Sequence, residues 1–528
     1  MDSVQELPKT PKIVSAQENV VKMGSDYIED NTMLELGYVQ VYRRVLRSAG
    51  NMCMVIALTS PLSAILITGF YQITFAGYWG LSWGWIIPNV IMFAEVLAIS
   101  ELASSMPVNG SFYWWAGALA PPQLSHCISY ITGWVNLLSI FTGTASFAYA
   151  VATSFSYSVN VALPTLLWTN PQLMGLSMGV VVLWAALMTL KLEKISIIYV
   201  SMAVIILVQT VLFLLGLPIT HALQNQPFAS GKQVFGELSN FSDWGLAVAV
   251  PYSWFCAMWV NSAWMIPVYM AEETHRASTE IPKSIILTFT TTAVAGLAVC
   301  LISAFCITDI EVAALDPSGY PLYDLVISHW GKTLSAAYFL VVTPVGFVGG
   351  SGTLLTYASQ IAAFARDGGL PYSEHFAYVH PRINAPIYSI ALLAAGTFLV
   401  LLFALSTEAK SIIYSLSVVA GLFTFIIPIF FRVFAGNRWV PGPFNLGRWS
   451  IPVHSFAVIS QLYIVVMECF PMDRQWTAST MNYNFAVGLG AVLIACFLYF
   501  FVGKKTFRGL NVEVLAARTR QHNVHVDG

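Results

Sequence analysis

Between residues 51 and 502 the chain is a succession of long apolar stretches separated by short polar gaps. A stretch of about 18 or more apolar residues crosses the roughly 30 Å hydrocarbon core of a bilayer as a helix. Membrane β-strands are shorter and alternate in polarity, which these stretches do not. The sequence therefore predicts an all-α polytopic membrane protein with twelve transmembrane helices. The predicted spans are 51–76, 83–106, 127–155, 172–190, 196–216, 246–270, 284–306, 333–363, 386–406, 411–434, 451–469 and 483–502.

The distribution of lysine and arginine predicts how these helices are oriented. Cytoplasmic gaps of membrane proteins are enriched in both residues. When the amino terminus is placed in the cytoplasm, only Lys232, Lys332, Lys410 and Arg474 of the 24 lysines and arginines lie outside. A span miscounted by one would scramble this asymmetry, so we expect both termini in the cytoplasm.

Composition and the ends of the chain support the same organisation. Only 9% of the residues are charged, whereas about a quarter are charged in a soluble protein. Residues 1–50 contain no apolar run that could act as a cleavable signal, so the first span is expected to direct insertion. We expect a cytoplasmic N-terminal tail at 1–50, a twelve-helix domain at 51–502 and a cytoplasmic C-terminal tail at 503–528.

The sequence offers little catalytic chemistry. The seven cysteines show no close pairing, and no metal, cofactor or nucleic-acid site is predicted. None of the nine histidines falls at mid-depth in a predicted span, and zinc-ligand spacings and phosphate loops are missing. These observations disfavour a membrane-embedded enzyme. A channel is disfavoured as well, because there is no repeated filter sequence.

Two of the predicted helices contain polar interruptions. The first span carries Pro61 with three hydroxyl residues nearby, and the sixth combines Asn261, Ser262 and Pro267 with two tryptophans. A simple proline kink explains either interruption alone equally well. Two interruptions five spans apart, however, are what an alternating-access transporter with inverted five-helix halves needs. The half-helix amino ends would then point at an anionic group of the solute.

Several motifs connect the chain to a known family. They are Ser100–Pro107 followed by Asn109-Gly110 and Tyr113–Trp115, Ala271–Thr274 with Ile281–Ile285, Phe364–Ser373, Pro441–Gly447 and Gly503–Phe507. With them, the chain resembles the amino acid, polyamine and organocation superfamily. The resemblance is greatest to the fungal amino acid and choline permeases, which include choline and γ-aminobutyrate (GABA) carriers. It implies a LeuT-like 5+5 inverted repeat with broken helices 1 and 6.

The resemblance and the two interruptions together predict a solute site. The solute carboxylate is expected against freed amides of the first break, and the sixth helix is expected to complete the pocket. The predicted substrate-binding residues are Thr59, Ser60, Pro61, Leu62, Ser63, Trp259, Asn261, Ser262, Trp264 and Met265.

The chain departs from its relatives at two positions in the sixth helix. Many relatives place an acidic residue and, four residues later, a histidine where this chain has Met265 and Tyr269. A carboxylate that could pair with a cationic head group is thus missing from this helix. Choline is correspondingly less expected, unless aromatic faces such as Trp259 or Trp264 hold it by cation–π contacts.

Charged residues in or near the spans predict coupling and gating. Glu95 lies within the second span, where an ionisable group is expensive, so it is the predicted proton-coupling carboxyl. A glutamate that is merely protonated in the apolar interior explains it equally well. Other charges are predicted to form a cytoplasmic gate, in which they pair when the inward path is closed. Alternatively, these residues are solvated loop charges without a gating role. The gating residues are Glu101, Glu272, Glu273, Arg366 and Asp367.

The sequence therefore predicts a secondary active permease, not an enzyme, in the plasma membrane. Its expected cargo is a small nitrogenous solute, such as an amino acid, a GABA-like zwitterion or a related amine, imported by proton symport with alternating access. Two alternatives share this fold: a permease for choline or another quaternary amine, and a nutrient receptor that no longer transports.

Overall fold

Long apolar helices make up most of the protein, because backbone groups inside a bilayer must be hydrogen-bonded within their own segment. The computed structural model describes residues 56–57, 59–166, 168–188, 192–381, 383, 385–406, 409–478 and 480–510. Among these residues, ten helices are long and apolar enough to cross a membrane. They are α4 (Pro61–Ser105), α6 (Ser125–Ala162), α7 (Asn170–Leu187), α8 (Leu192–Leu223), α12 (Ala277–Cys306), α14 (Pro321–Arg366), α16 (Ile387–Leu401), α17 (Ala409–Val433), α18 (Ser450–Met467) and α19 (Asn484–Leu498). Short helices that follow directly extend α16 to Leu405 and α19 to Thr506.

Helix α4 accounts for two of the predicted spans. Its backbone leaves helical geometry at Gly77, with φ 61° and ψ −136°. A Cβ atom at Gly80 would lie 2.0 Å from the carbonyl oxygen of Gln72, so the chain folds back on itself here. The predicted helices at 51–76 and 83–106 are therefore joined by a tight turn in place of a polar loop.

The sixth predicted span, 246–270, is interrupted. Its first part consists of α10 (Leu246–Tyr252) and α11 (Phe255–Val260). Turn residues follow, and then the 3-10 helix η2 (Ile266–Glu273). Because Leu246–Val260 is shorter than the other spans, it is not among the ten long helices.

Helix α14 extends well beyond the predicted span at 333–363. It begins at Pro321 and is divided at Gly331, which has φ 74° and ψ 164°. This left-handed φ favours glycine, because a Cβ atom would be strained there. We call residues 321–330, which precede the division, the α14 head.

The helices differ strongly in how much of their surface is buried. In the most apolar window of α6, 83% of the residues are buried within the protein, against 11% for α19. Helix α6 therefore lies inside the bundle and α19 at its periphery. The exposed side chains of α19 are large and apolar, which suits contact with lipid.

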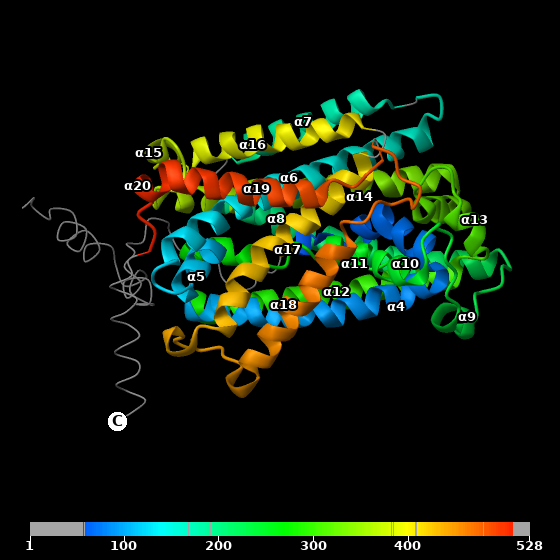
Figure 1. The fold of residues 1–528 in the computed structure, drawn as a ribbon. Helices are drawn as coiled ribbons and strands as arrows, with labels where there is room; N and C mark the ends of the chain where they lie inside the picture. Colours follow the sequence, from blue (N-terminus) through cyan, green and yellow to red (C-terminus); the bar gives the residue numbers. More distant parts are fainter. Residues whose placement is uncertain are drawn as a thin grey trace, which may run out of the picture.

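Short elements gather at the two ends of the bundle (Figure 1). At one end lie α5 (Ser111–Leu119), α15 (Ser373–Phe376) and α20 (Lys504–Thr506), and at the other α9 (Gly231–Gly236) and α13 (Ile310–Ala314). We call these the α5 end and the α9 end, and the α5 end is the one predicted to face the cytoplasm. The predicted tail at 1–50 and residues 511–528 lie outside the described residues. The remaining short helices are η3 (Leu402–Leu405), η4 (Gly436–Arg438), η5 (Gly447–Trp449) and η6 (Tyr499–Gly503).

Candidate functional site

The break predicted in the first helix is present at Ser60. This residue has φ 30° and ψ 67°, a left-handed conformation, and α4 starts at the following proline. The Ser60 amide donates to the carbonyl of Ile56 at 3.0 Å, and the Ser60 carbonyl accepts from the amide of Ala64 at 3.1 Å. The chain thus stays hydrogen-bonded on both sides of the break, and the first turn of α4 begins inside the bundle.

A pocket lined by hydroxyl groups lies beside this break, and we call it the hydroxyl pocket. The Ser60 and Ser63 hydroxyls are 3.0 Å apart on one side of it. The Ser154 and Thr343 hydroxyls are 3.2 Å apart and line it as well. Among the described residues that line it, none is charged at neutral pH. The pocket therefore offers polar groups without a fixed charge. Its lining is Thr59, Ser60, Ser63, Ala64, Ile67, Phe147, Ala150, Val151, Ser154, Trp259, Val342, Thr343 and Gly346.

The break in the sixth helix begins directly after Trp259 and Val260. Trp259 is 2% exposed and forms part of the wall of the hydroxyl pocket. Its ring packs against Tyr414, with centroids 4.9 Å apart, and against Phe147 at 5.6 Å. Its indole nitrogen donates to the Ser146 hydroxyl at 3.4 Å. The tryptophan is thus fixed by three neighbours from α6 and α17.

Asn261, the first residue after α11, stabilises the break through side-chain hydrogen bonds to neighbouring helices. Its amide nitrogen donates to the Asn89 side chain at 2.7 Å, and its amide oxygen accepts from the Thr292 hydroxyl at 2.8 Å. These bonds tie the broken helix to α4 and α12. The Asn261 side chain is fully buried and lines neither this pocket nor the next one.

A second pocket lies on the other side of Phe147, and we call it the Glu95 pocket. Ser262, Trp264 and Met265 of the broken helix line it together with Glu95 of α4. Glu95 is 2% exposed, and its Oε1 has no hydrogen-bond partner. Within the described lining, Glu95 is the one acidic residue. A buried carboxyl that faces a cavity without a cationic partner has the environment of a proton-carrying group.

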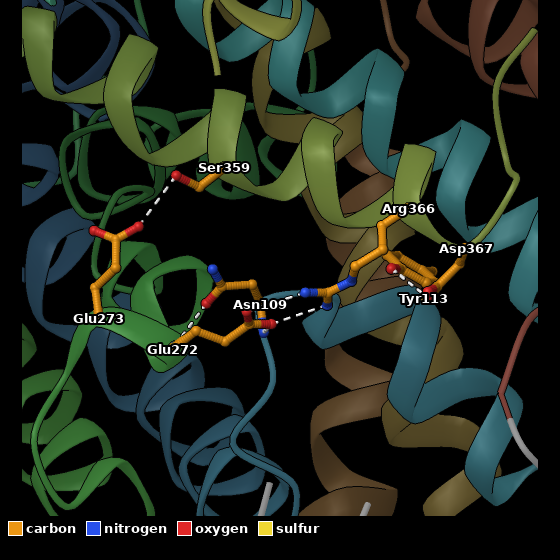
Figure 2. Close-up of polar contacts among 7 residues, drawn as sticks. All are labelled: Asn109, Tyr113, Glu272, Glu273, Ser359, Arg366 and Asp367. Carbon is orange, nitrogen blue, oxygen red and sulfur yellow. Dashed lines mark hydrogen bonds and ion pairs between the residues drawn. The ribbon is translucent and has the colours of Figure 1, made fainter. Parts of the chain in front are cut away.

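Charged residues pair near the α5 end (Figure 2). The Arg366 guanidinium donates to both carboxylate oxygens of Glu272, at 2.9 Å and 3.1 Å. The Glu272 amide donates to the Asn109 side chain at 2.8 Å, so the η2 helix is held to the turn before α5. Glu272 is fully buried. The alternative of a solvated loop charge is therefore wrong for this residue.

The neighbouring charges of this cluster have separate partners. Glu273 accepts a hydrogen bond from the Ser359 hydroxyl at 3.3 Å, and Asp367 accepts one from the Tyr113 hydroxyl at 3.0 Å. Both acids are buried, so solvation does not explain them either. Together with the Glu272–Arg366 pair, these bonds connect η2, α5 and the end of α14.

The geometry of two polar pockets at two broken helices agrees with a comparison of the whole sequence. The profile of the amino acid permease family matches residues 50–494. The chain belongs to the amino acid permease family. It is accordingly a multi-pass membrane transporter and not an enzyme.

Relatives of this permease span nearly its full length. An uncharacterized amino-acid permease of Schizosaccharomyces pombe is 27% identical, over 96% of this chain and 89% of its own length. The GABA-specific permease of Saccharomyces cerevisiae is also 27% identical, over 91% of this chain and 86% of its own. The residues matched by the family, 50–494, include the two breaks and the charge cluster.

The permease brings most of the predicted substrate-binding residues to one of the two pockets. Thr59, Ser60, Ser63 and Trp259 line the hydroxyl pocket, and Ser262, Trp264 and Met265 line the Glu95 pocket. The other three line neither pocket: Pro61, Leu62 and Asn261.

Several lining residues of the permease were not predicted. Phe147 lines both pockets, and Ser154, Thr343 and Tyr357 contribute polar groups. The only signal that could have found Ser154 and Thr343 is their polarity inside apolar spans. Many other hydroxyl residues share that property and bond to a carbonyl of their own helix instead, as Thr142 does.

Glu101 of the permease does not join the charge cluster of Glu272. Its carboxylate accepts from the Leu446 amide at 3.0 Å and from the Ser450 hydroxyl at 2.6 Å. The His454 ring lies 3.6 Å away. Glu101 thus fastens the end of α4 to the loop before α18, apart from η2 and the end of α14.

Proposed function

We propose that this protein is a secondary active permease that imports a small nitrogenous solute by alternating access. The expected cargo is an amino acid, a GABA-like zwitterion or a related amine, and the coupling ion is H⁺. The observation that carries the proposal is the hydroxyl pocket, where the break at Ser60 faces Trp259 at the second break. Transporters with inverted repeats typically form their solute site from two such discontinuous helices.

The proposed fold has twelve transmembrane helices in a LeuT-like 5+5 inverted repeat. In this count α4 supplies the first two helices, and α10, α11 and η2 together supply the sixth. The breaks at Ser60 and after Val260 then fall in helices 1 and 6, one in each half. Both termini are proposed to lie in the cytoplasm, with the protein in the plasma membrane.

The solute carboxylate is proposed to bind at the start of α4. Helix amino termini carry unpaired amides and a partial positive charge, which favour an anionic group. The Ser60 and Ser63 hydroxyls add further hydrogen-bond donors in the same pocket. The apolar part of the solute would lie against Trp259 and Phe147.

Glu95 is proposed to carry the coupled proton. Its carboxyl faces a pocket that also contains residues of the broken sixth helix, so its protonation state affects the part of the helix that must move. Moving a neutral, protonated carboxyl across the apolar bundle costs far less than moving a carboxylate. The Glu272–Arg366 pair is proposed to be the cytoplasmic gate in its closed state, with Glu273 and Asp367 supporting it.

The proposal is tested by uptake into transporter-deficient yeast that expresses this chain. Labelled amino acids, GABA, choline and polyamines are supplied separately, with and without a protonophore. Uptake of a zwitterion that the protonophore abolishes is the expected result. Uptake of choline alone would replace the zwitterion with a quaternary amine, and no uptake of any solute despite surface expression would contradict transport and favour a receptor.

A further inference from the structure

Two buried histidines face each other near the α9 end, and neither lines the hydroxyl pocket or the Glu95 pocket. His221 lies in the last turn of α8, and His329 lies in the α14 head. His221 Nδ1 and His329 Nε2 are 2.8 Å apart, and the two ring planes are nearly parallel, with an angle of 18° between them and centroids 5.1 Å apart. His221 is fully buried and His329 is 7% exposed.

The two outer ring nitrogens face groups that can only accept a hydrogen bond. His329 Nδ1 lies 2.7 Å from the carbonyl oxygen of Leu325. His221 Nε2 lies 3.3 Å from the carbonyl oxygen of Pro227. The Ser328 hydroxyl, 3.2 Å from His329 Nδ1, gives its own hydrogen to the Leu325 carbonyl. Each outer nitrogen must therefore carry a hydrogen to make a favourable contact.

Counting hydrogens shows which protonation state fits this geometry. The three contacts of His221 and His329 require three N–H hydrogens, one at each outer nitrogen and one between the rings. Two neutral imidazoles carry only two, and two imidazolium rings carry four, which sets N–H against N–H between them. A pair that has taken up one extra proton carries three and satisfies every contact.

An aromatic ring and an amide side chain lie beside the histidine pair. The Phe228 ring packs on His221 with centroids 4.4 Å apart, and the Gln224 side chain donates to the His329 carbonyl. Within the described part of the chain, neither ring forms an ion pair with a carboxylate. Of the charged residues nearest in α14, Asp324 bonds to Ser318 and Tyr157, and Lys332 is exposed.

We propose that His221 and His329 form a binding site for one shared proton, which clamps the α14 head to the end of α8. The clamp is tightest over an intermediate pH range, because both loss of the shared proton and uptake of a second one disrupt a contact. The head also reaches the hydroxyl pocket, since the Tyr323 hydroxyl lies 2.9 Å from that of Ser154. Gly331, directly after the head, allows it to move relative to the rest of α14.

Hydrogen exchange of the purified full-length protein across pH tests this site without any transported solute. After correction for intrinsic exchange rates, protection of peptides from residues 321–330 is expected to pass through a maximum and fall roughly tenfold on either side. In His329→Leu the protection is expected to be low at every pH. Peptides from α5, at the opposite end and without a histidine or an acid, serve as the internal reference. His375→Leu is the matched control because His375 is exposed.

The proposal is overturned if protection of the α14 head changes with pH in the same way as protection of α5. A maximum that persists in His329→Leu overturns it as well. If that variant does not fold, His221→Phe, which keeps an aromatic ring beside Phe228, replaces it. Failure of solute uptake would affect the proposed permease function and leave this result unchanged.

Discussion

Arg366 holds the carboxylate of Glu272 through two parallel hydrogen bonds, at 2.9 Å and 3.1 Å, while Asn109 binds the Glu272 amide. Such a two-point geometry fixes orientation as well as charge. The pair is asymmetric, since the Arg366 side chain is 26% exposed and that of Glu272 is fully buried. Removal of the arginine is therefore more harmful than its exposure suggests, because the carboxylate cannot reach water.

Arg366→Ala is expected to destabilise the protein by about 3 kcal/mol, since it removes the Arg366 guanidinium that pairs with a buried carboxylate. The midpoint of unfolding in detergent measures this. Lys283→Ala is the matched control, because Lys283 is 69% exposed in its pair with Glu280 and such pairs contribute about 0–1 kcal/mol. Adding Glu272→Gln to Arg366→Ala should restore part of the loss. If Lys283→Ala and Arg366→Ala lower the unfolding midpoint equally, the Glu272–Arg366 pair does not hold the gate closed.

The motifs that connect the chain to its family meet physically at the α5 end. Ser104 accepts a hydrogen bond from the Phe444 amide at 2.8 Å, and the Ser105 hydroxyl donates to the Val440 carbonyl. The ring centroids of Phe364 and Phe507 lie 5.9 Å apart. The motif residues 100–107 and 441–447 thus form one joint, and 364–373 and 503–507 form another.

Gly442→Ala is expected to break the first of these joints. A Cβ atom there would lie 2.4 Å from the backbone carbon of Ser104, and a backbone atom cannot give way cheaply. Gly175→Ala is the matched control, in which the change in stability is expected to have the opposite sign. Nothing lies within 4 Å of its Cβ position in α7, and alanine should stabilise that helix by about 0.5–1 kcal/mol. Unfolding midpoints that shift in the same direction for both variants would contradict this packing.

The sequence predicted the helices and the breaks better than it predicted the pocket walls. Hydropathy over a whole span is a strong signal, and Pro61 marks the first break directly because it cannot continue a helix as an amide donor. The direction of a single side chain is not encoded so plainly. As a polar residue in an apolar span, Asn261 is predicted to bind solute. In the structure its side-chain amide is hydrogen-bonded to Asn89 and Thr292 instead.

Long-range partners explain the other differences. Glu101 and Glu272 were assigned to one gate, but they bond to different elements, because their partners Ser450 and Arg366 are distant in the sequence. The histidine pair cannot be predicted from the sequence for the same reason, since its two members are distant in the chain. His221 and His329 are in separate helices. Neither lies at the middle of a predicted span, where an ionisable residue indicates a functional role.

Trp259→Phe is expected to raise the KM for the imported solute by about tenfold, because a smaller ring loses contact area in the pocket. The kcat of transport should change less, since residue 259 contacts the bound solute to a similar extent throughout the transport cycle. Phenylalanine is preferred to alanine because removal of a buried tryptophan side chain to alanine costs about 3–5 kcal/mol of stability. Trp184→Phe is the control, as Trp184 is equally buried but lines neither pocket. Unchanged KM values for every accepted solute would show that Trp259 does not contact solute.

Glu95→Gln is expected to uncouple solute uptake from the pH gradient. The amide has the shape and neutrality of the protonated carboxyl but cannot release a proton, so any remaining uptake should lose its response to a protonophore. Glu468→Gln is the matched control, because Glu468 is also fully buried without a hydrogen-bond partner for its carboxyl oxygens but lines neither pocket. Uptake is measured in both variants across an imposed gradient. If Glu95→Gln keeps the wild-type dependence on that gradient while Glu468→Gln loses it, the coupled proton is carried by Glu468 near the α9 end, and the carboxyl at the solute pockets serves packing alone.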